Sequence, residues 1–184
     1  MNKEVQVITI CPDKAMAGEK CPVLYLLHGY GGNAGTWLGI KPELPQIADK
    51  EGIIFVCPDG KNSWYWDSPL NKEYRYETFV SKELVNYIDK NFTTKVERGG
   101  RAITGLSMGG HGSLWLSIRH KDVFGGGGSM SGGLDIRPFP NNWEMKKQLG
   151  EEASNKQRWD EHTVINQLDK IKNGDHGCYN RLRL

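Results

Sequence analysis

The stretch Ala102-Ile103-Thr104-Gly105-Leu106-Ser107-Met108-Gly109-Gly110-His111-Gly112-Ser113-Leu114-Trp115 decides the fold of this chain. It contains the pattern G-x-S-x-G, with a short apolar run before it and a helix-capable run after it. A strand that turns sharply into a helix around a serine is the context of a nucleophile elbow. We expect the glycines to let strand and helix pass closely and Ser107 to be strained, with its hydroxyl exposed. The alternative is a glycine-rich turn whose serine only caps the helix.

A second glycine-rich loop, His28-Gly29-Tyr30-Gly31-Gly32-Asn33, directly follows an apolar run at residues 22–27. The run is typical of a strand buried on both faces of a sheet. Glycines after such a strand let backbone N–H groups point into a cleft, as in the H-G-G-G-type oxyanion loops of esterases. We therefore expect the amides of Tyr30 and Met108 to form an oxyanion hole. The alternative is an ordinary turn between a strand and a helix.

Three aromatic residues stand in the polar loop at residues 61–69, at Trp64, Tyr65 and Trp66. The two tryptophans are candidates for lining an acyl or aryl pocket, and packing the loop down is an equally good interpretation. Asp67 is a candidate for binding a polar substrate group, although a loop aspartate more often caps a turn.

Apolar and helical patterns alternate along the chain and predict an α/β fold with a mainly parallel sheet and helices on both faces. We expect a single domain over residues 1–184. Strands are predicted at residues 5–10, 22–27, 53–57, 101–106 and near 125–133, and the main helices at 44–51, 73–92, 107–120, 144–149 and 155–172. The run Gly125 to Gly128 is not followed by Gly-Lys-Ser/Thr, so we interpret it as a strand squeezed against a helix rather than a phosphate loop.

Composition excludes several function classes. Of the 184 residues 38% are hydrophobic and 25% charged, an ordinary globular balance, and the net charge of +2 makes no electrostatic case for nucleic acid. No run reaches the length of a membrane span and no signal peptide is visible, so the chain as it stands is expected in the cytoplasm. The four cysteines form no C-x-x-C pair, so we expect no metal site and free thiols; a Cys11–Cys21 disulfide would require export.

Taken together, residues 22–33 and 105–112 resemble the esterase D-like family of the α/β-hydrolases. This family includes feruloyl and acetyl xylan esterases, S-formylglutathione hydrolase and the mycolyltransferases. The segments 57–60, 62–69, 76–79 and 129–132 extend the resemblance to nearly all of residues 4–173. It implies Ser107 as nucleophile, the Tyr30 and Met108 amides as oxyanion hole, no cofactor, and a small-molecule or carbohydrate ester as substrate. The tryptophan-rich loop is most similar to the feruloyl and acetyl xylan esterases, and members of the family are often secreted.

The chain departs from the family pattern after Lys172. In the family, a strand with the catalytic acid and a later histidine would follow, whereas here Asp175 and His176 are adjacent and the chain ends at Leu184. His28 is expected to hold its loop, because the base follows the serine in this fold. His111, on the elbow helix, would point away from Ser107, His120 ends that helix, and His162 is expected in a solvated helix start.

We therefore expect a C-terminally incomplete α/β-hydrolase domain that lacks its last strands, its acid and its histidine. An exposed sheet edge would favour a homo-oligomer that covers it. The predicted function is a serine carboxylic ester hydrolase that works through an acyl-enzyme on Ser107. Loss of a triad member leaves about 10³- to 10⁴-fold catalysis over water, so weak activity is expected. A catalytically dead binding protein of the same fold and an acyltransferase are the alternatives.

Overall fold

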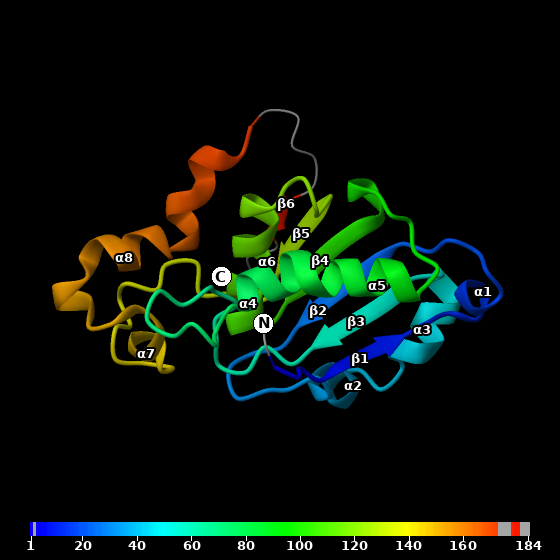
Figure 1. Ribbon diagram of the computed structural model, residues 1–184, viewed down its shortest axis with the longest axis horizontal. Helices are drawn as coiled ribbons and strands as arrows, with labels where there is room; N and C mark the ends of the chain where they lie inside the picture. Colours follow the sequence, from blue (N-terminus) through cyan, green and yellow to red (C-terminus); the bar gives the residue numbers. More distant parts are fainter. Residues whose placement is uncertain (2, 173–177, 181–184) are drawn as a thin grey trace.

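A six-stranded sheet forms the centre of the computed structural model, which describes residues 1, 3–172 and 178–180 (Figure 1). Its order is β1-β3-β2-β4-β5-β6; β1 pairs antiparallel with β3, and the other pairs are parallel. The strands are β1 (Val7–Ile10), β2 (Val23–Leu27), β3 (Ile54–Pro58), β4 (Arg101–Gly105), β5 (Gly126–Ser129) and β6 (Cys178–Asn180).

Helices connect these strands as the sequence pattern predicts. The α-helices are α1 (Asp13–Met16), α2 (Thr36–Ile40), α3 (Leu44–Glu51), α4 (Tyr76–Thr78), α5 (Val85–Asn91), α6 (Met108–Arg119), α7 (Met145–Leu149) and α8 (Lys156–Glu161). A π-helical stretch (Phe79–Leu84) joins α4 to α5, and 3₁₀ turns lie at Arg98–Gly100, Glu152–Ser154 and Val164–Lys170. Among the described residues, no helix has the length and apolar character needed to cross a membrane.

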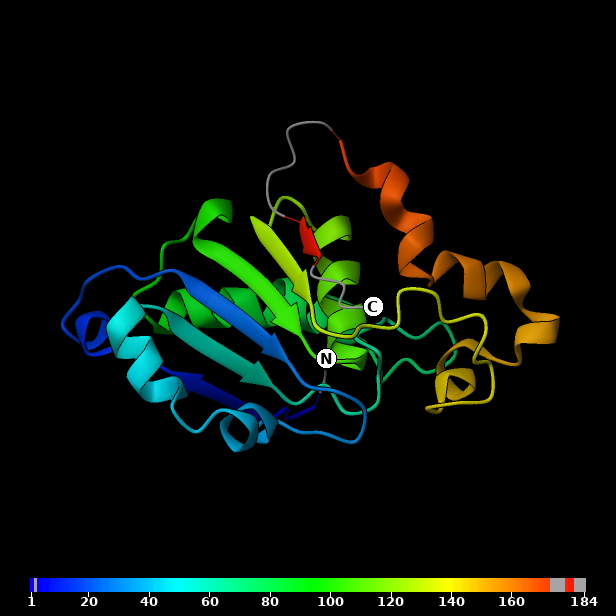
Figure 2. The ribbon, with the colours of Figure 1, turned by 180° about the vertical axis from the view of Figure 1, so that it is seen from behind.

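The two faces of the sheet are covered by different helices (Figures 1 and 2). Side chains of α5 and α6 pack on one face, with Tyr25 and Ile103 of the central strands in the same core. Side chains of α2 and α3 pack on the other face, against Leu26 and Phe55. Successive β2 residues therefore enter opposite cores, which explains the unbroken apolar run that predicted this strand.

The carboxyl ends of the parallel strands meet at one edge of the sheet. Leu27 of β2 pairs with Gly105 of β4, so the loops that follow these strands leave the sheet side by side. Beyond β4 and β5, Leu106 and Met130 form one further bridge. Figure 1 shows α7 and α8 lying past this edge, where open α/β sheets place their binding sites.

The run of glycines at β5 forms a strand that packs closely against a helix, as predicted. A Cβ atom on Gly127 would lie 2.1 Å from the Ser117 Oγ of α6. Only glycine therefore allows β5 to pack this tightly against the elbow helix.

The predicted helix over residues 73–92 is wrong in detail. The helical segment begins at Tyr76, ends at Asn91 and contains the π-helical stretch. Regular helical spacing places Tyr87 on the apolar face with Val80 and Leu84 and places Glu77 on the solvated side. Tyr87 is nevertheless 59% exposed, whereas Glu77 is only 8% exposed. The extra residue that a π-turn inserts shifts the faces of the helix, which regular 3.6-residue spacing does not anticipate.

The predicted helix over residues 155–172 is divided. Thr163 is extended, is buried, and bonds through its hydroxyl to the Trp159 carbonyl, which separates α8 from the 3₁₀ turn. Helical spacing places Leu168 on one side with Val164 and Ile171, but Leu168 is exposed whereas Val164 is buried.

No element was predicted after Lys172, yet β6 extends the sheet by pairing with β5. A strand this short carries too little alternation to be detected, and the available edge of β5 determines where it pairs. The predictions made for Asp175, His176 and residues 181–184 lie outside the described residues.

Candidate active site

Ser107 occupies a strained turn between β4 and α6. Its backbone has φ 55° and ψ −115°, which a residue with a side chain rarely adopts, and the residue is exposed. The turn is held by hydrogen bonds from the Ser107 amide to the Met130 carbonyl (2.8 Å) and from the His111 amide to the Ser107 carbonyl (3.0 Å). Within the described part of the chain, its hydroxyl makes no capping bond to α6. The geometry is that of an elbow rather than of a helix cap.

The two glycines of the motif are required by contact with backbone. A Cβ atom on Gly105 would lie 2.3 Å from the Gly109 carbonyl oxygen. A Cβ atom on Gly109 would lie 2.2 Å from the Leu27 carbonyl oxygen and 2.7 Å from that of His28. The sharp turn therefore exists only because β2, β4 and α6 approach each other without side chains between them.

The loop after β2 lies directly beside Ser107. A Cβ atom on Gly29 would be 3.5 Å from the Ser107 Cβ. The Gly32 amide bonds to the Gly29 carbonyl (3.0 Å), so residues 29–32 form a tight turn, in which Tyr30 is 39% exposed. Across residues 1, 3–172 and 178–180, neither the Tyr30 nor the Met108 amide donates a hydrogen bond. The Met108 amide is also at the start of α6, where N–H groups lack partners within the helix.

His28 holds the loops together. The Gly60 amide donates to its Nε2 (2.8 Å) and its Nδ1 lies 2.7 Å from the Gly29 carbonyl oxygen, so Nδ1 carries the proton. Burial lowers the pKa of His28, which outweighs the opposing contribution of Asp59. A buried, neutral ring with both nitrogens occupied fits the structural role predicted for it.

The aromatic loop is packed inward. Trp66 is completely buried and its indole N–H donates to the His111 Nε2 (2.9 Å). Trp64 is 4% exposed and stacks on Trp66, with ring centroids 5.5 Å apart. Trp66 therefore has no surface to offer a ligand, and packing was the correct alternative for this side chain.

Asp67 caps the start of the helical segment after the aromatic loop. Its carboxylate accepts hydrogen bonds from the Thr78 amide (2.9 Å) and the Arg75 Nε (3.0 Å). It lines a different cavity from the surroundings of Ser107, described below. The Thr78 amide lies 11 residues after Asp67, so this bond joins the loop to the helical segment instead of capping a turn within the loop.

The imidazole rings of the four described histidines all bond to groups other than Ser107. His111 is fully buried, and burial lowers its pKa to about 4, so the ring is neutral. Its Nδ1 lies 2.8 Å from the Gly133 carbonyl oxygen. His162 is not solvated as predicted, because its ring stacks on Trp115 with centroids 5.4 Å apart. The Nε2 of His120 lies 2.9 Å from Glu77.

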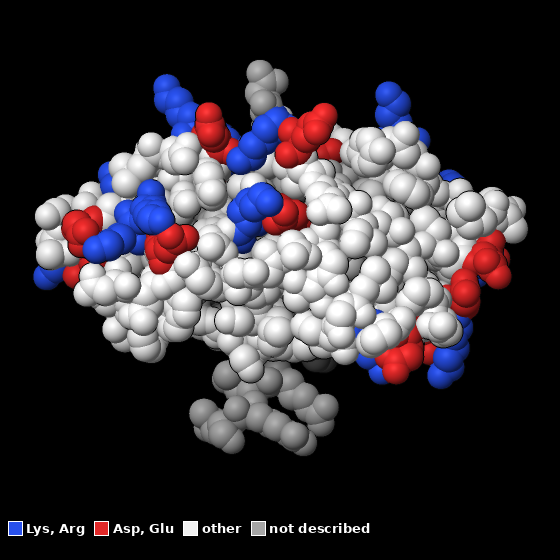
Figure 3. Space-filling view, turned by 90° about the horizontal axis from the view of Figure 1, so that it is seen from below, with Lys and Arg blue, Asp and Glu red and all other residues white. Residues whose placement is uncertain are grey.

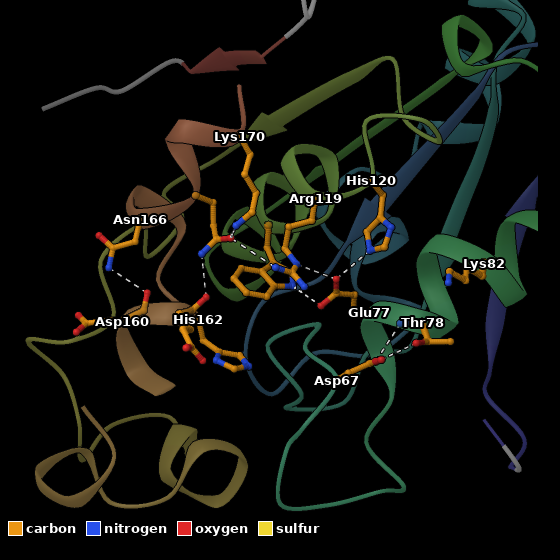
Figure 4. Close-up of a pocket in the computed structure, with 13 residues that line it drawn as sticks. Asp67, Glu77, Thr78, Lys82, Arg119, His120, Asp160, His162, Asn166 and Lys170 are labelled. Carbon is orange, nitrogen blue, oxygen red and sulfur yellow. Dashed lines mark hydrogen bonds and ion pairs between the residues drawn. The ribbon is translucent and has the colours of Figure 1, made fainter. Parts of the chain in front are cut away.

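Glu77 is the centre of a second polar cluster, in a cavity of about 660 Å³ between α6 and the C-terminal helical turns (Figure 4). Its carboxylate accepts hydrogen bonds from Trp115 (2.9 Å) and Arg119 (2.8 Å) and contacts His120. Burial alone would raise the pKa of Glu77, but these partners outweigh it and lower the pKa to about 2. The carboxylate is satisfied within the protein, so we interpret the cluster as a structural tie between helices.

Glu77→Gln is expected to lower the free energy of unfolding at pH 7 by about 3 kcal/mol, since the shift of more than two pKa units is lost. Because the folded pKa lies below the unfolded value, the stabilisation is complete above about pH 4.5 and disappears as the pH falls toward 2. Urea unfolding at several pH values measures this. The exposed Glu73→Gln is the matched control. An unchanged pH dependence between pH 5 and 3 in Glu77→Gln would contradict this assignment.

Charge elsewhere is mixed. On the face in Figure 3, basic and acidic side chains lie intermixed near the margins and the middle is largely uncharged. Among the described residues, no group of three or more His, Cys, Asp or Glu side chains could hold a metal ion. Cys11, Cys21 and Cys57 are free thiols, so Cys11 and Cys21 form no disulfide.

Two proteins that are related to this chain in sequence are named as esterases. The chain is 30% identical to an acetyl esterase of Caldicellulosiruptor saccharolyticus over 74% of its own length and 53% of the relative. It is 34% identical to an endo-1,4-beta-xylanase/feruloyl esterase of Xylanibacter ruminicola over 62% of its own length and 17% of the relative. The chain therefore spans about half, or less, of the lengths of these relatives.

The fold itself is shared with solved enzymes. An S-formylglutathione hydrolase from Agrobacterium tumefaciens superposes with a TM-score of 0.78 at 21% identity, covering 97% of this chain and 81% of that one. This likeness shows the α/β-hydrolase fold predicted from the sequence. The family model described as "Putative esterase" matches residues 1–177. With nearly its whole length matched, the chain belongs to this esterase family.

Proposed function

We propose that this protein is a serine carboxylic ester hydrolase that works through an acyl-enzyme on Ser107. The observation that carries the proposal is the exposed, strained Ser107 beside two backbone amides, of Tyr30 and Met108, that have no partner among the described residues. Amides fixed in this way stabilise the oxyanion that develops when an ester carbonyl is attacked. The start of α6 adds a favourable dipole at the same place.

In the proposed reaction the Ser107 Oγ forms a bond to the ester carbonyl carbon, and the carbonyl oxygen becomes an oxyanion between the two amides. The C–O bond to the alcohol then breaks, and the alcohol leaves with a proton. Water next attacks the acyl-enzyme and releases the acid. A histidine takes the serine proton in enzymes of this type. The described histidines are bonded elsewhere, so no described residue is assigned this role.

We propose acetyl or feruloyl esters of carbohydrate as the substrate class. The acetyl esterase and feruloyl esterase names of two relatives support this choice. Trp64 is only 4% exposed, so its part at the margin of the acyl site would be to hold Trp143, which is 43% exposed and whose carbonyl accepts the Trp64 indole N–H (3.2 Å).

A panel of esters tests the proposal. We expect 4-nitrophenyl acetate and methyl ferulate to be cleaved above the background set by Ser107→Ala, and an ester with a long fatty acyl chain to be cleaved more slowly. Added sugar acceptors that gain the acyl group, with hydrolysis suppressed, would indicate an acyltransferase instead. Equal rates for wild type and Ser107→Ala on every ester would leave the non-catalytic binding protein as the better account.

A further inference from the structure

The turn that presents the Tyr30 amide has the geometry of a type II turn. Its third residue, Gly31, has φ 74°, as a type II turn requires, and the Gly32 amide closes the turn on Gly29. Type I and type II turns differ mainly by rotation of the central peptide, here the one between Tyr30 and Gly31. That rotation would turn the Tyr30 carbonyl and the Gly31 N–H, whereas the Tyr30 N–H belongs to the preceding peptide. A bond to the Gly31 N–H therefore acts on the Tyr30 amide by holding the whole turn in place.

Asn62 supplies that bond from the loop after β3. Its Oδ1 accepts the Gly31 N–H at 2.9 Å, and its Nδ2 donates to the Glu144 Oε2 at 3.3 Å. The carboxylate thus orients the amide group of Asn62, because an amide that donates on one side must accept on the other.

Glu144 is itself anchored. It is paired with Lys147, and its interaction with the Tyr30 phenol contributes to a lowered pKa of the carboxyl. Trp143 and Glu144 both have positive φ, at 49° and 55°, and the Trp143 carbonyl accepts the indole N–H of Trp64. Two consecutive residues in the left-handed region persist only where the surroundings hold them. The segment before α7 is therefore fixed against the Tyr30 turn.

We propose that Asn62, oriented by Glu144, is a positioning residue that fixes the turn at residues 29–32 beside Ser107 and so keeps the Tyr30 amide directed at the oxyanion. The inference rests on the proposed ester hydrolysis at Ser107. Neither side chain touches the reacting atoms in this account. Their effect is to keep a donor in place before the reaction begins, which is the basis of oxyanion stabilisation by fixed dipoles.

Asn62→Ala in the full chain tests this. We expect kcat for 4-nitrophenyl acetate to fall about tenfold, equivalent to one lost hydrogen bond, while KM changes less than about twofold. Amide hydrogen exchange in a peptide covering residues 29–33 should become faster. Asn71→Ala is the matched control, since Asn71 also accepts a backbone N–H within a loop but lies away from the turn (Glu73 amide, 3.0 Å).

A double variant in which the amide and the carboxylate exchange places distinguishes a positioning role from a general loss of structure. In the double variant Asn62→Asp with Glu144→Gln, a carboxylate accepts both the Gly31 N–H and the new amide, so the network is rebuilt with opposite polarity. We expect it to recover kcat and slow exchange. Wild-type kcat and exchange in Asn62→Ala would overturn the proposal, as would a loss that the double variant does not restore. If wild type itself shows no turnover, the proposed function fails, whereas the exchange comparison still decides whether Asn62 holds the turn.

Discussion

Gly109→Ala is expected to lower the free energy of unfolding by about 4 kcal/mol or more, an exceptional cost for one methyl group. The added Cβ would meet the carbonyl oxygen of Leu27 at 2.2 Å, and that atom is backbone of the central strand β2. Neither β2 nor α6 can move without opening the turn at Ser107. Since whole domains are stable by only about 5–15 kcal/mol, at least about a quarter of the free energy of unfolding would be lost. Urea unfolding followed by circular dichroism measures the change.

Gly39→Ala provides the control for this substitution. Gly39 is exposed within α2, and a Cβ there has no heavy atom within 4 Å. Alanine is the better helix former, so we expect unchanged stability or a gain of up to about 1 kcal/mol. A Gly109→Ala protein as stable as Gly39→Ala would contradict the close contact between β2 and α6.

Tyr30→Pro is expected to slow ester cleavage by about 100- to 1000-fold, the usual cost of removing one oxyanion donor. Proline has no N–H, yet it is favoured at the second position of a type II turn, which is the position of Tyr30. The substitution therefore deletes the amide donor while the turn stays compatible with its backbone. The rate of 4-nitrophenyl acetate cleavage, normalised to the folded fraction, measures the effect.

Tyr30→Ala is the matched control because it loses the phenol and its contact with Glu144 but keeps the amide. We expect it to retain the rate within a few fold. An equal loss in both variants would show that the side chain, rather than the amide, matters. A wild-type rate in Tyr30→Pro would remove Tyr30 from the oxyanion hole.

The sequence predicts the elbow well because its signal is local. The glycines two residues on either side of Ser107 form a short pattern that can be recognised without its partners, even though the Gly109 contact is with the distant Leu27. The same holds for β2, whose apolar run is decided by burial on both faces. These two segments suffice to define the fold class and the Ser107 side of the site.

Contacts between distant residues explain what the sequence could not predict. Glu77 is buried because Arg119 and His120, more than 40 residues later, supply its partners. Trp66 is packed inward because His111, 45 residues later, accepts its N–H. Asn62 was not singled out at all, since its partner Glu144 is 82 residues away. Its position two residues after the Pro58-Asp59-Gly60 break was the one available signal.

The central claim is that Ser107 is a nucleophile whose strained backbone conformation holds its hydroxyl exposed beside the oxyanion hole. Reaction of the purified protein with a fluorophosphonate, followed by mass spectrometry of its peptides, tests this most directly. The account predicts one adduct, on Ser107, that is absent from Ser107→Ala and forms more slowly in Tyr30→Pro. An unmodified Ser107, or an adduct on another serine, would contradict it.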